Sequence, residues 1–223
     1  MKIETIVAIV LVGIAVVILL KPGKSKPTGT IIASAGPTQA VPNIGGYYLN
    51  GDAKQLSSEW FQLTEDKQSK NGSVAWHINP GLNWVLTMNI QSIHTSSNGQ
   101  GDGFLIGVYK NQADIFKFRD SKSGISFLLD EYNNNETSIW IGGTKVASGT
   151  FVVDDGRVHR VEIRCLSGKF DIVVDGVTTC SFTDAQFSFR QDVLNAKTGV
   201  WVTGSCGAAT NEHRVKNIVF QSL

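Results

Sequence analysis

The feature that most constrains the fold is a succession of short β-type runs from about Gly45 to the C-terminus. Apolar side chains alternate with polar ones in these runs, or the run is wholly apolar, and turn pairs such as Ser167-Gly168 and Asp175-Gly176 separate them. No stretch of about 12 residues here has the 3.6-residue period of a helix. The predicted strands are Ser58 to Leu63, Val74 to Ile78, Trp84 to Ile93, Phe104 to Tyr109, Ile115 to Phe118, Ile125 to Asp130, Ser138 to Ile141, Val158 to Cys165, Phe170 to Val174, Gly199 to Val202 and Val215 to Phe220. About a dozen strands in about 180 residues predict an all-β fold, a two-sheet sandwich or jelly roll.

The run Val158 to Cys165 shows the alternation clearly. His159, Val161, Ile163 and Cys165 share the face that we expect to pack in the core. Arg160, Glu162 and Arg164 share the other face, which we expect to be solvated and to form cross-strand ion pairs, or alternatively to dock a partner protein.

A different segment precedes this β region. Thr5 to Leu20 is an uninterrupted apolar run, close to the ~20 residues that cross a bilayer. The alternative is a cleaved signal peptide, but the small-residue site Ala33-Ser34-Ala35 lies far downstream of the apolar core. We therefore predict a transmembrane anchor over residues 1–21, a Pro/Gly-rich linker over 22–45 and a β-sandwich domain over 46–223.

Charge gives the expected side of the membrane and excludes one class of partner. Residues 1–26 carry four lysines and one glutamate, a balance of +3, which leaves −2 for the rest because the whole chain carries +1. Lysines follow the apolar run, so the large domain is predicted on the cytoplasmic side of a single-pass membrane protein, or on the capsid-facing side of a virion inner membrane. A slightly acidic domain argues against nucleic-acid binding, which needs a clustered basic face.

The three cysteines are Cys165, Cys180 and Cys206, and their spacing fits neither a zinc site nor complete internal pairing. Cys165 is in phase with a buried strand face, so we expect a buried thiol. One bridge, for example Cys165 to Cys180, stays open as an alternative.

Oxygen-bearing side chains follow the apolar strand Ile125 to Asp130. Carboxylates and amides on a loop held by a rigid strand suit a hard cation such as Ca²⁺, and they also suit sugar hydroxyls. A solvated turn is the alternative interpretation, because Asn and Asp are common turn residues. These side chains are Asp130, Glu131, Asn133, Asn134, Asn135 and Glu136.

Three segments resemble the legume-type lectins of the concanavalin A-like superfamily. Gly101 to Leu105 resembles the family's Ala/Gly-Asp-Gly turn, and Leu129 to Asn134 resembles its Phe-Asp-Thr-Tyr-x-Asn metal loop. Thr198 to Gly204, followed by His213 to Phe220, resembles its closing strand pair. Strands around Arg157 to Glu162 and Phe170 to Gly176 also look like laminin G-like modules, which share the sandwich.

The resemblance implies specific site residues. Asp102 and Asn134 would contact sugar, and Asp130, the Tyr132 carbonyl and Asn134 would bind Ca²⁺, with Glu136 as the available second acid. The Gly101–Asp102 peptide bond would be cis. Leu128 stands where the family has an acid, so a transition-metal site is not expected.

Enzymatic chemistry is not expected. The superfamily's glucanases place two catalytic Glu around an Asp, and the corresponding positions here are Leu128, Asp130 and Asn133. Glu131 is predicted to face away from Asp130. The four histidines are scattered, and the Gly99 to Gly103 segment, which lacks a following helix, is read as a hairpin turn.

Two non-enzymatic hypotheses remain. The first is a membrane-anchored structural or docking protein, such as a minor capsid or membrane protein of a large virus with an internal bilayer. The second is a carbohydrate-binding receptor that uses the loop site around Asp102 and Asn134. The predicted cytoplasmic side favours the first hypothesis, because glycans are scarce there.

Overall fold

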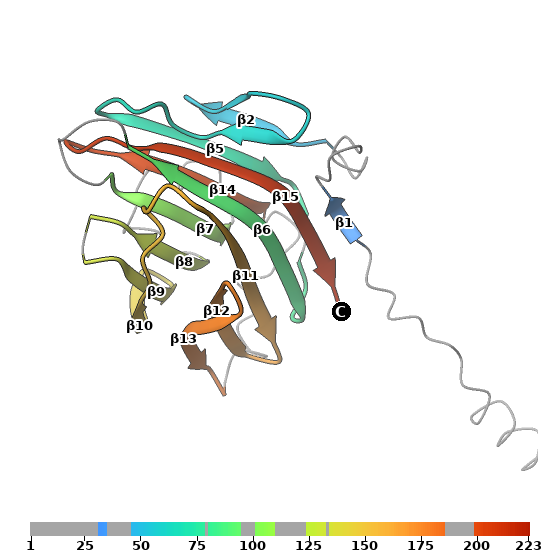
Figure 1. The fold of residues 1–223 in the computed structure, drawn as a ribbon. Coiled ribbons are helices and arrows are strands. Elements are labelled where there is room, and N and C mark those ends of the chain that lie inside the picture. The colour runs from blue at the N-terminus through green and yellow to red at the C-terminus, as the bar shows by residue number, and fades with distance from the viewer. Residues whose placement is uncertain are drawn as a thin grey trace, which may run out of the picture.

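Two antiparallel β-sheets lie face to face in the structure, a computed structural model that describes residues 31–34, 46–78, 80–94, 101–109, 124–132, 134–185 and 199–223 (Figure 1). The eight-stranded sheet has the order β13-β12-β11-β6-β15-β4-β3, with β1 also paired to β15. Its strands are β1 (Ile31–Ser34), β3 (Lys54–Gln55), β4 (Trp60–Gln62), β6 (Trp84–Ile93), β11 (Val158–Leu166), β12 (Lys169–Val174), β13 (Val177–Thr183) and β15 (Glu212–Ser222).

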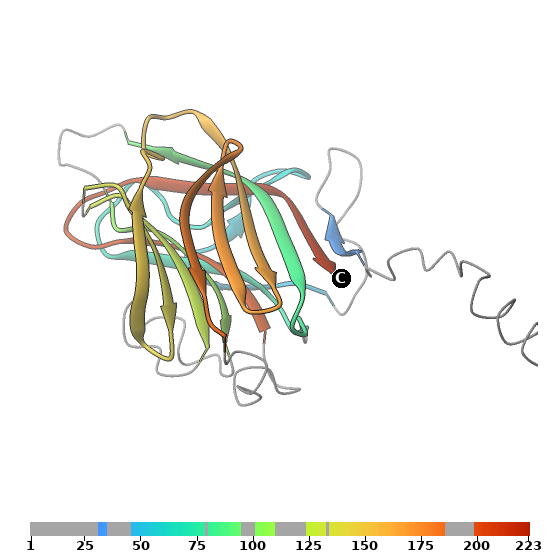
Figure 2. The ribbon, with the colours of Figure 1, turned by 90° about the horizontal axis from the view of Figure 1, so that it is seen from below.

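The seven-stranded sheet has the order β10-β9-β8-β7-β14-β5-β2. Its strands are β2 (Tyr48–Gly51), β5 (Lys70–Trp76), β7 (Gly103–Tyr109), β8 (Ile125–Asp130), β9 (Glu136–Ile141), β10 (Thr144–Thr150) and β14 (Gly199–Cys206). Figure 2 shows the two sheets from below. At one side the sheets meet, where Thr137 Oγ1 of β9 donates a hydrogen bond to the Thr179 carbonyl of β13 at 3.5 Å.

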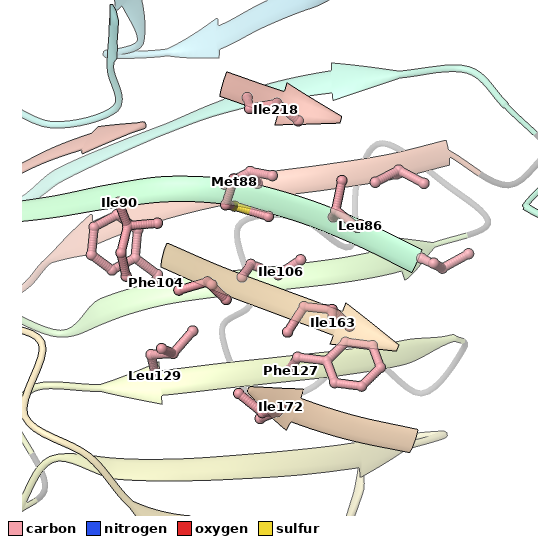
Figure 3. Close-up of a cluster of buried hydrophobic side chains, with 14 of the residues drawn as sticks. Leu86, Met88, Ile90, Phe104, Ile106, Phe127, Leu129, Ile163, Ile172 and Ile218 are labelled. Carbon is pink, nitrogen blue, oxygen red and sulfur yellow. The ribbon is translucent and has the colours of Figure 1, made fainter. Parts of the chain in front are cut away.

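The core lies between the sheets because each strand turns its apolar alternate residues inward. Along β6, Leu86, Met88 and Ile90 are buried while the residues between them are half-exposed. They pack against side chains such as Ile106 and Phe127 from the opposite sheet (Figure 3). The predicted two-sheet, all-β sandwich is confirmed.

Strand β11 follows the predicted alternation. His159, Val161, Ile163 and Cys165 are each at most 1% exposed. On the outer face, Glu162 pairs with Arg160 at 3.3 Å and with Arg164, so these two ion pairs run along the strand, whereas cross-strand pairs were expected.

The structure corrects two interpretations of the sequence. The strands β6 and β7, which flank the Gly99 to Gly103 segment, belong to different sheets, so they do not form the predicted hairpin. Cys165, Cys180 and Cys206 are all free and buried, so the alternative Cys165–Cys180 bridge does not form. Burial raises the pKa of the Cys165 thiol to about 12.

Several sequence predictions concern residues that the structure does not describe. The predicted anchor Thr5 to Leu20 and the predicted strand Ile115 to Phe118 are not among them. Within the described ranges, no helix has the length and hydrophobicity needed to span a membrane. Ile31–Ser34, inside the predicted linker, pairs antiparallel with the end of β15.

Candidate functional site

Three neighbouring strands bring the predicted ligand residues to one edge of the seven-stranded sheet. Gly103, which begins β7, pairs with Asp130 at the end of β8 and with Ser205 near the end of β14. Asp102 therefore lies beside both the loop after β8 and the loop after β14. Its N–H donates to the Ser205 carbonyl at 3.0 Å, and its carbonyl accepts from the Glu131 N–H at 3.3 Å.

The Asp102 carboxylate has a fixed orientation at this edge. Its Oδ2 accepts a hydrogen bond from Ser205 Oγ at 2.9 Å, and the side chain is half-buried. The loop after β14 passes close by, because a Cβ at Gly207 would lie 3.1 Å from Asp102 Oδ1. A half-buried carboxylate held in this way presents hydrogen-bond acceptors without a large loss of side-chain entropy on binding.

The expected cis peptide is wrong. The Gly101–Asp102 bond lies among the described residues, and none of the peptide bonds there is cis. The chain turns into β7 at Gly103 instead, where φ is +111° and a Cβ would lie only 2.1 Å from the Leu129 carbonyl oxygen. Only glycine fits this position.

The loop after β8 carries Asn134 and lies next to β10. Asn134 and Asn135 both have φ of +56°, a left-handed conformation that asparagine tolerates. The Phe151 N–H donates to the Asn135 carbonyl at 2.9 Å and fixes the loop against the chain that follows β10. Asn134 and Glu136 line a hollow of about 300 Å³ together with Ser148, Gly149 and Thr150. Asp102 is not among its lining residues, so the two predicted sugar contacts lie on one edge but not in one hollow.

The predicted Ca²⁺ ligands are only partly suited to the ion. Asp130 is 2% exposed and lies, by strand alternation, on the sheet face opposite the core residue Leu129. Glu136 is already engaged, since Lys145 Nζ donates to its two oxygens at 2.9 and 3.0 Å. No group of three or more His, Cys, Asp or Glu side chains that could hold a metal ion occurs in the described part of the chain. With Glu136 held by Lys145, a Ca²⁺ ion here would need backbone, amide and water oxygens to complete its six to eight ligands.

Comparison with known proteins identifies the family. The legume-like lectin family matches residues 36–161, more than half of the sequence. The chain belongs to the legume-like lectin family. No curated protein sequence matches it.

Solved lectin structures share the fold of this family member. The VIP36 exoplasmic/lumenal domain in its Ca²⁺- and mannose-bound form is similar with a TM-score of 0.67 and 18% identity, over 79% of this chain and 83% of that one. The Emp47p carbohydrate recognition domain gives a TM-score of 0.64 and 14% identity, over 86% and 94% of the two chains. The seed lectin of Lotus tetragonolobus gives 0.66 and 12%, over 79% and 92%. The predicted concanavalin A-like sandwich is thus confirmed.

The lectin fold also encloses a polar network that the sequence reading did not find. Glu131 points into the sandwich, as its predicted direction away from Asp130 requires, and is fully buried. Its Oε2 accepts hydrogen bonds from Ser92 Oγ at 2.9 Å and from Asn211 Nδ2, and lies 3.2 Å from His213 Nε2. The sequence held one signal for these residues, which is strand alternation. Glu131 continues the inward-facing positions of Leu129, and His213 continues those of Val215.

The hydrogen bonds of His213 indicate a charged imidazole. Thr64 Oγ1 donates its one proton to the Asn211 carbonyl at 2.9 Å, so the His213 Nδ1–H must donate to Thr64 at 2.7 Å. The Nε2–H faces the Glu131 carboxylate. Burial alone would lower the pKa of His213, but the negative charge of Glu131 and the hydrogen bonds that His213 makes to Cys206 and Glu131 outweigh burial and raise the pKa to about 10.

This network is not a catalytic site. Cys206 Sγ lies 3.7 Å from His213 Nδ1, an arrangement that would suit a nucleophile and its base. Cys206, His213 and Glu131 are, however, each at most 2% exposed, so no substrate can reach the thiol. The related proteins are lectins, which agrees with the prediction that the chain is not an enzyme.

Proposed function

We propose that this chain is a carbohydrate-binding lectin whose ligand lies on the edge formed by Asp102 and the Asn134 loop. The observation that carries the proposal is the fixed Asp102 carboxylate, held by Ser205 beside two converging loops of a lectin fold. Relatives of the same fold support it, since VIP36 is described in mannose-bound form and Emp47p as a carbohydrate recognition domain. The comparisons favour this hypothesis over a structural role in a virion.

The chain's own groups supply the recognition chemistry. The Asp102 carboxylate accepts hydrogen bonds from two adjacent sugar hydroxyls, and the exposed Asn134 amide both donates and accepts. Ser148 and Thr150 add hydroxyl groups in the hollow beside Asn134. Tyr132, 69% exposed, offers an aromatic face to the C–H side of a sugar ring.

A glycan array with purified full-length protein tests the proposal. Wild type should bind a defined set of glycans, while Asp102→Asn and Asn134→Ala should each lower affinity by about tenfold or more. The matched control is Glu59→Gln, because the Glu59 side chain makes, among the described residues, a single long ion pair of 3.9 Å with Lys216 of the eight-stranded sheet. No glycan bound by wild type, or equal loss in the control, contradicts the proposal.

Calcium enters the same experiment as a variable. The Ca²⁺-bound forms of VIP36 motivate the comparison. Because Glu136 is held by Lys145 and the described residues lack a metal cluster, we expect binding to fall by less than about tenfold in chelator. A complete loss in chelator would instead assign Asp130, Tyr132 and Asn134 to a Ca²⁺ site.

We also propose that the lectin domain is tethered to a membrane by the apolar run Thr5 to Leu20. Alkaline extraction should leave the full chain in the membrane fraction and release a variant that lacks residues 1–26. The charge rule places the domain on the cytoplasmic side, where glycan ligands are scarce. Glycosylation of the sequon at Asn71 or Asn135 during eukaryotic expression would place it on the opposite side.

A further inference from the structure

We propose that the buried Glu131 is the positioning residue of the carbohydrate-binding edge. Its carboxylate fixes the Asp102 turn, the loop after β8 and the loop after β14 relative to one another. This inference rests on the proposed lectin function for its binding consequence, but its structural consequence can be measured without any glycan.

The first link joins Glu131 to Asp102 through the backbone. The Glu131 N–H donates to the Asp102 carbonyl, and the Asp102 N–H donates to the Ser205 carbonyl. Any displacement of Glu131 therefore acts on the peptide that carries the ligand-facing carboxylate. Since Asp102 Oδ2 is also bound by Ser205 Oγ, the side chain moves with its backbone.

The second link joins Glu131 to the loop after β14. Asn211 Nδ2 donates both to Glu131 Oε2 and to Ser92 Oγ, the latter at 2.9 Å. Asn211 closes the segment that begins at Gly207, the residue whose backbone passes beside Asp102. One carboxylate oxygen thus holds the loop after β14 directly, through Asn211, while the backbone N–H of Glu131 holds the Asp102 turn.

The third link is the close packing of the Asp102 turn on the network. A Cβ at Gly101 would lie 3.2 Å from both Asn211 Cβ and His213 Cε1, and 3.3 Å from Cys206 Sγ. The chain at Gly101 therefore packs tightly on these side chains, which would have to shift by a few tenths of an ångström to admit a methyl group. Glu131 orients the same side chains that support the turn.

The network is anchored in both sheets, so it can act as a rigid support. Ser92 lies on β6 and His213 on β15 of the eight-stranded sheet, while Glu131 follows β8 of the other sheet. Thr64 binds the far side of the His213 ring at 2.7 Å. Sites whose contacting groups are held by buried hydrogen bonds keep their geometry before the ligand arrives. The same argument explains why partners behind the contacting residues affect affinity.

The Glu131 side chain itself suggests the decisive variants. Glu131 Oε2 accepts all the hydrogen bonds described, whereas Oε1 is buried and has no partner among the described residues. Glu131→Gln keeps one acceptor oxygen, whereas Glu131→Met keeps the length of the side chain and removes it. A positioning role predicts that glutamine retains function that methionine loses.

The experiment measures glycan affinity and amide hydrogen exchange in full-length protein. In Glu131→Met we expect about tenfold weaker binding. We also expect about tenfold faster exchange of the Asp102 and Glu131 amides relative to amides of β12. Glu131→Gln should stay within about threefold of wild type in both measurements. If Glu131→Met does not fold, Asn211→Ala takes its place, because it removes the link to the loop after β14.

Asp171→Asn is the matched control. Asp171 on β12 is also a buried carboxylate, 5% exposed, and accepts from Ser181 Oγ at 2.6 Å. It should lower stability without changing glycan affinity or the exchange of Asp102, which in this variant is compared with amides of β5 because Asp171 itself lies on β12. Equal loss of binding in this control, or unchanged exchange and binding in a folded Glu131→Met, overturns the proposal. If wild type binds no glycan, the lectin function fails, and exchange of the Asp102 amide alone decides whether Glu131 positions the turn.

Discussion

Replacing His213 by leucine tests the buried ion pair with a magnitude that the structure supplies. The substitution removes the imidazolium that faces Glu131 at 3.2 Å and leaves the carboxylate fully buried without its counter-charge. Removing one partner of a buried ion pair costs about 3–5 kcal/mol. The His213 pKa, raised from 6.5 to about 10, corresponds at 1.36 kcal/mol per unit to about 5 kcal/mol. Both routes predict a loss that is a large fraction of a domain's total stability.

A double-mutant cycle separates the ion pair from general packing damage. Urea unfolding of wild type, His213→Leu, Glu131→Leu and the double variant gives the coupling free energy directly. Because apolar replacement of a whole buried pair is often neutral, the double variant should be more stable than the sum of the single losses predicts, by about 2 kcal/mol or more. Additive losses would refute the assignment of a charged pair.

The pH dependence gives a second reading of the same pair. The folded pKa of His213 is raised above its unfolded value, so the stabilisation is fully present below about pH 6.5 and is lost as pH rises towards 10. The difference in unfolding free energy between wild type and His213→Leu should therefore shrink from pH 6.5 to pH 10. A difference that stays constant over this range would show that His213 is neutral in the folded state.

Three further predictions concern the surroundings of the site. Gly103→Ala should lower the unfolding free energy by at least about 2 kcal/mol, because its Cβ would meet the Leu129 carbonyl at 2.1 Å; urea unfolding measures this. Burial alone would raise the pKa of Asp155, but hydrogen bonds from Arg157 and His159 outweigh burial and lower the pKa to about 2. The stabilisation by this carboxylate is therefore present above pH 3.8 and is lost as pH falls through 2. Asp155→Asn should accordingly lower the unfolding free energy by about 1 kcal/mol at pH 7 and have little effect below pH 2. Thr150→Phe should fill the hollow beside Asn134 and weaken glycan binding on the array without changing the melting temperature.

The central strands could be predicted from the sequence because each has at least one buried face. Strand β6 was predicted with its observed bounds, Trp84–Ile93, since its burial alternates along all ten residues. Strand β8 is buried on both faces, and its largely apolar sequence, with Ser126 and Asp130 as the polar residues, identified it equally well. In both cases the hydrophobic pattern reflects which faces of the strand are buried in the sandwich.

The strands that the sequence did not predict are the outermost ones. Strands β2 and β10 end the seven-stranded sheet, and β3 and β13 end the eight-stranded sheet. Their residues are mostly exposed or half-exposed, as along β10, so no apolar alternation marks them. Such strands form because a neighbour offers unpaired backbone groups, which is a property of the assembled sheet.

The sequence by itself determined the fold class and the two residues, Asp102 and Asn134, that we assign to the ligand edge. Both stand in short motifs next to predicted strands, so a few consecutive residues were enough to identify them. Only the tertiary structure decided what supports that edge, since Glu131 and His213 are 82 positions apart and meet only when the two sheets pack. A carboxylate and an imidazole can tolerate full burial only as partners, and no local pattern states which distant side chain will be the partner.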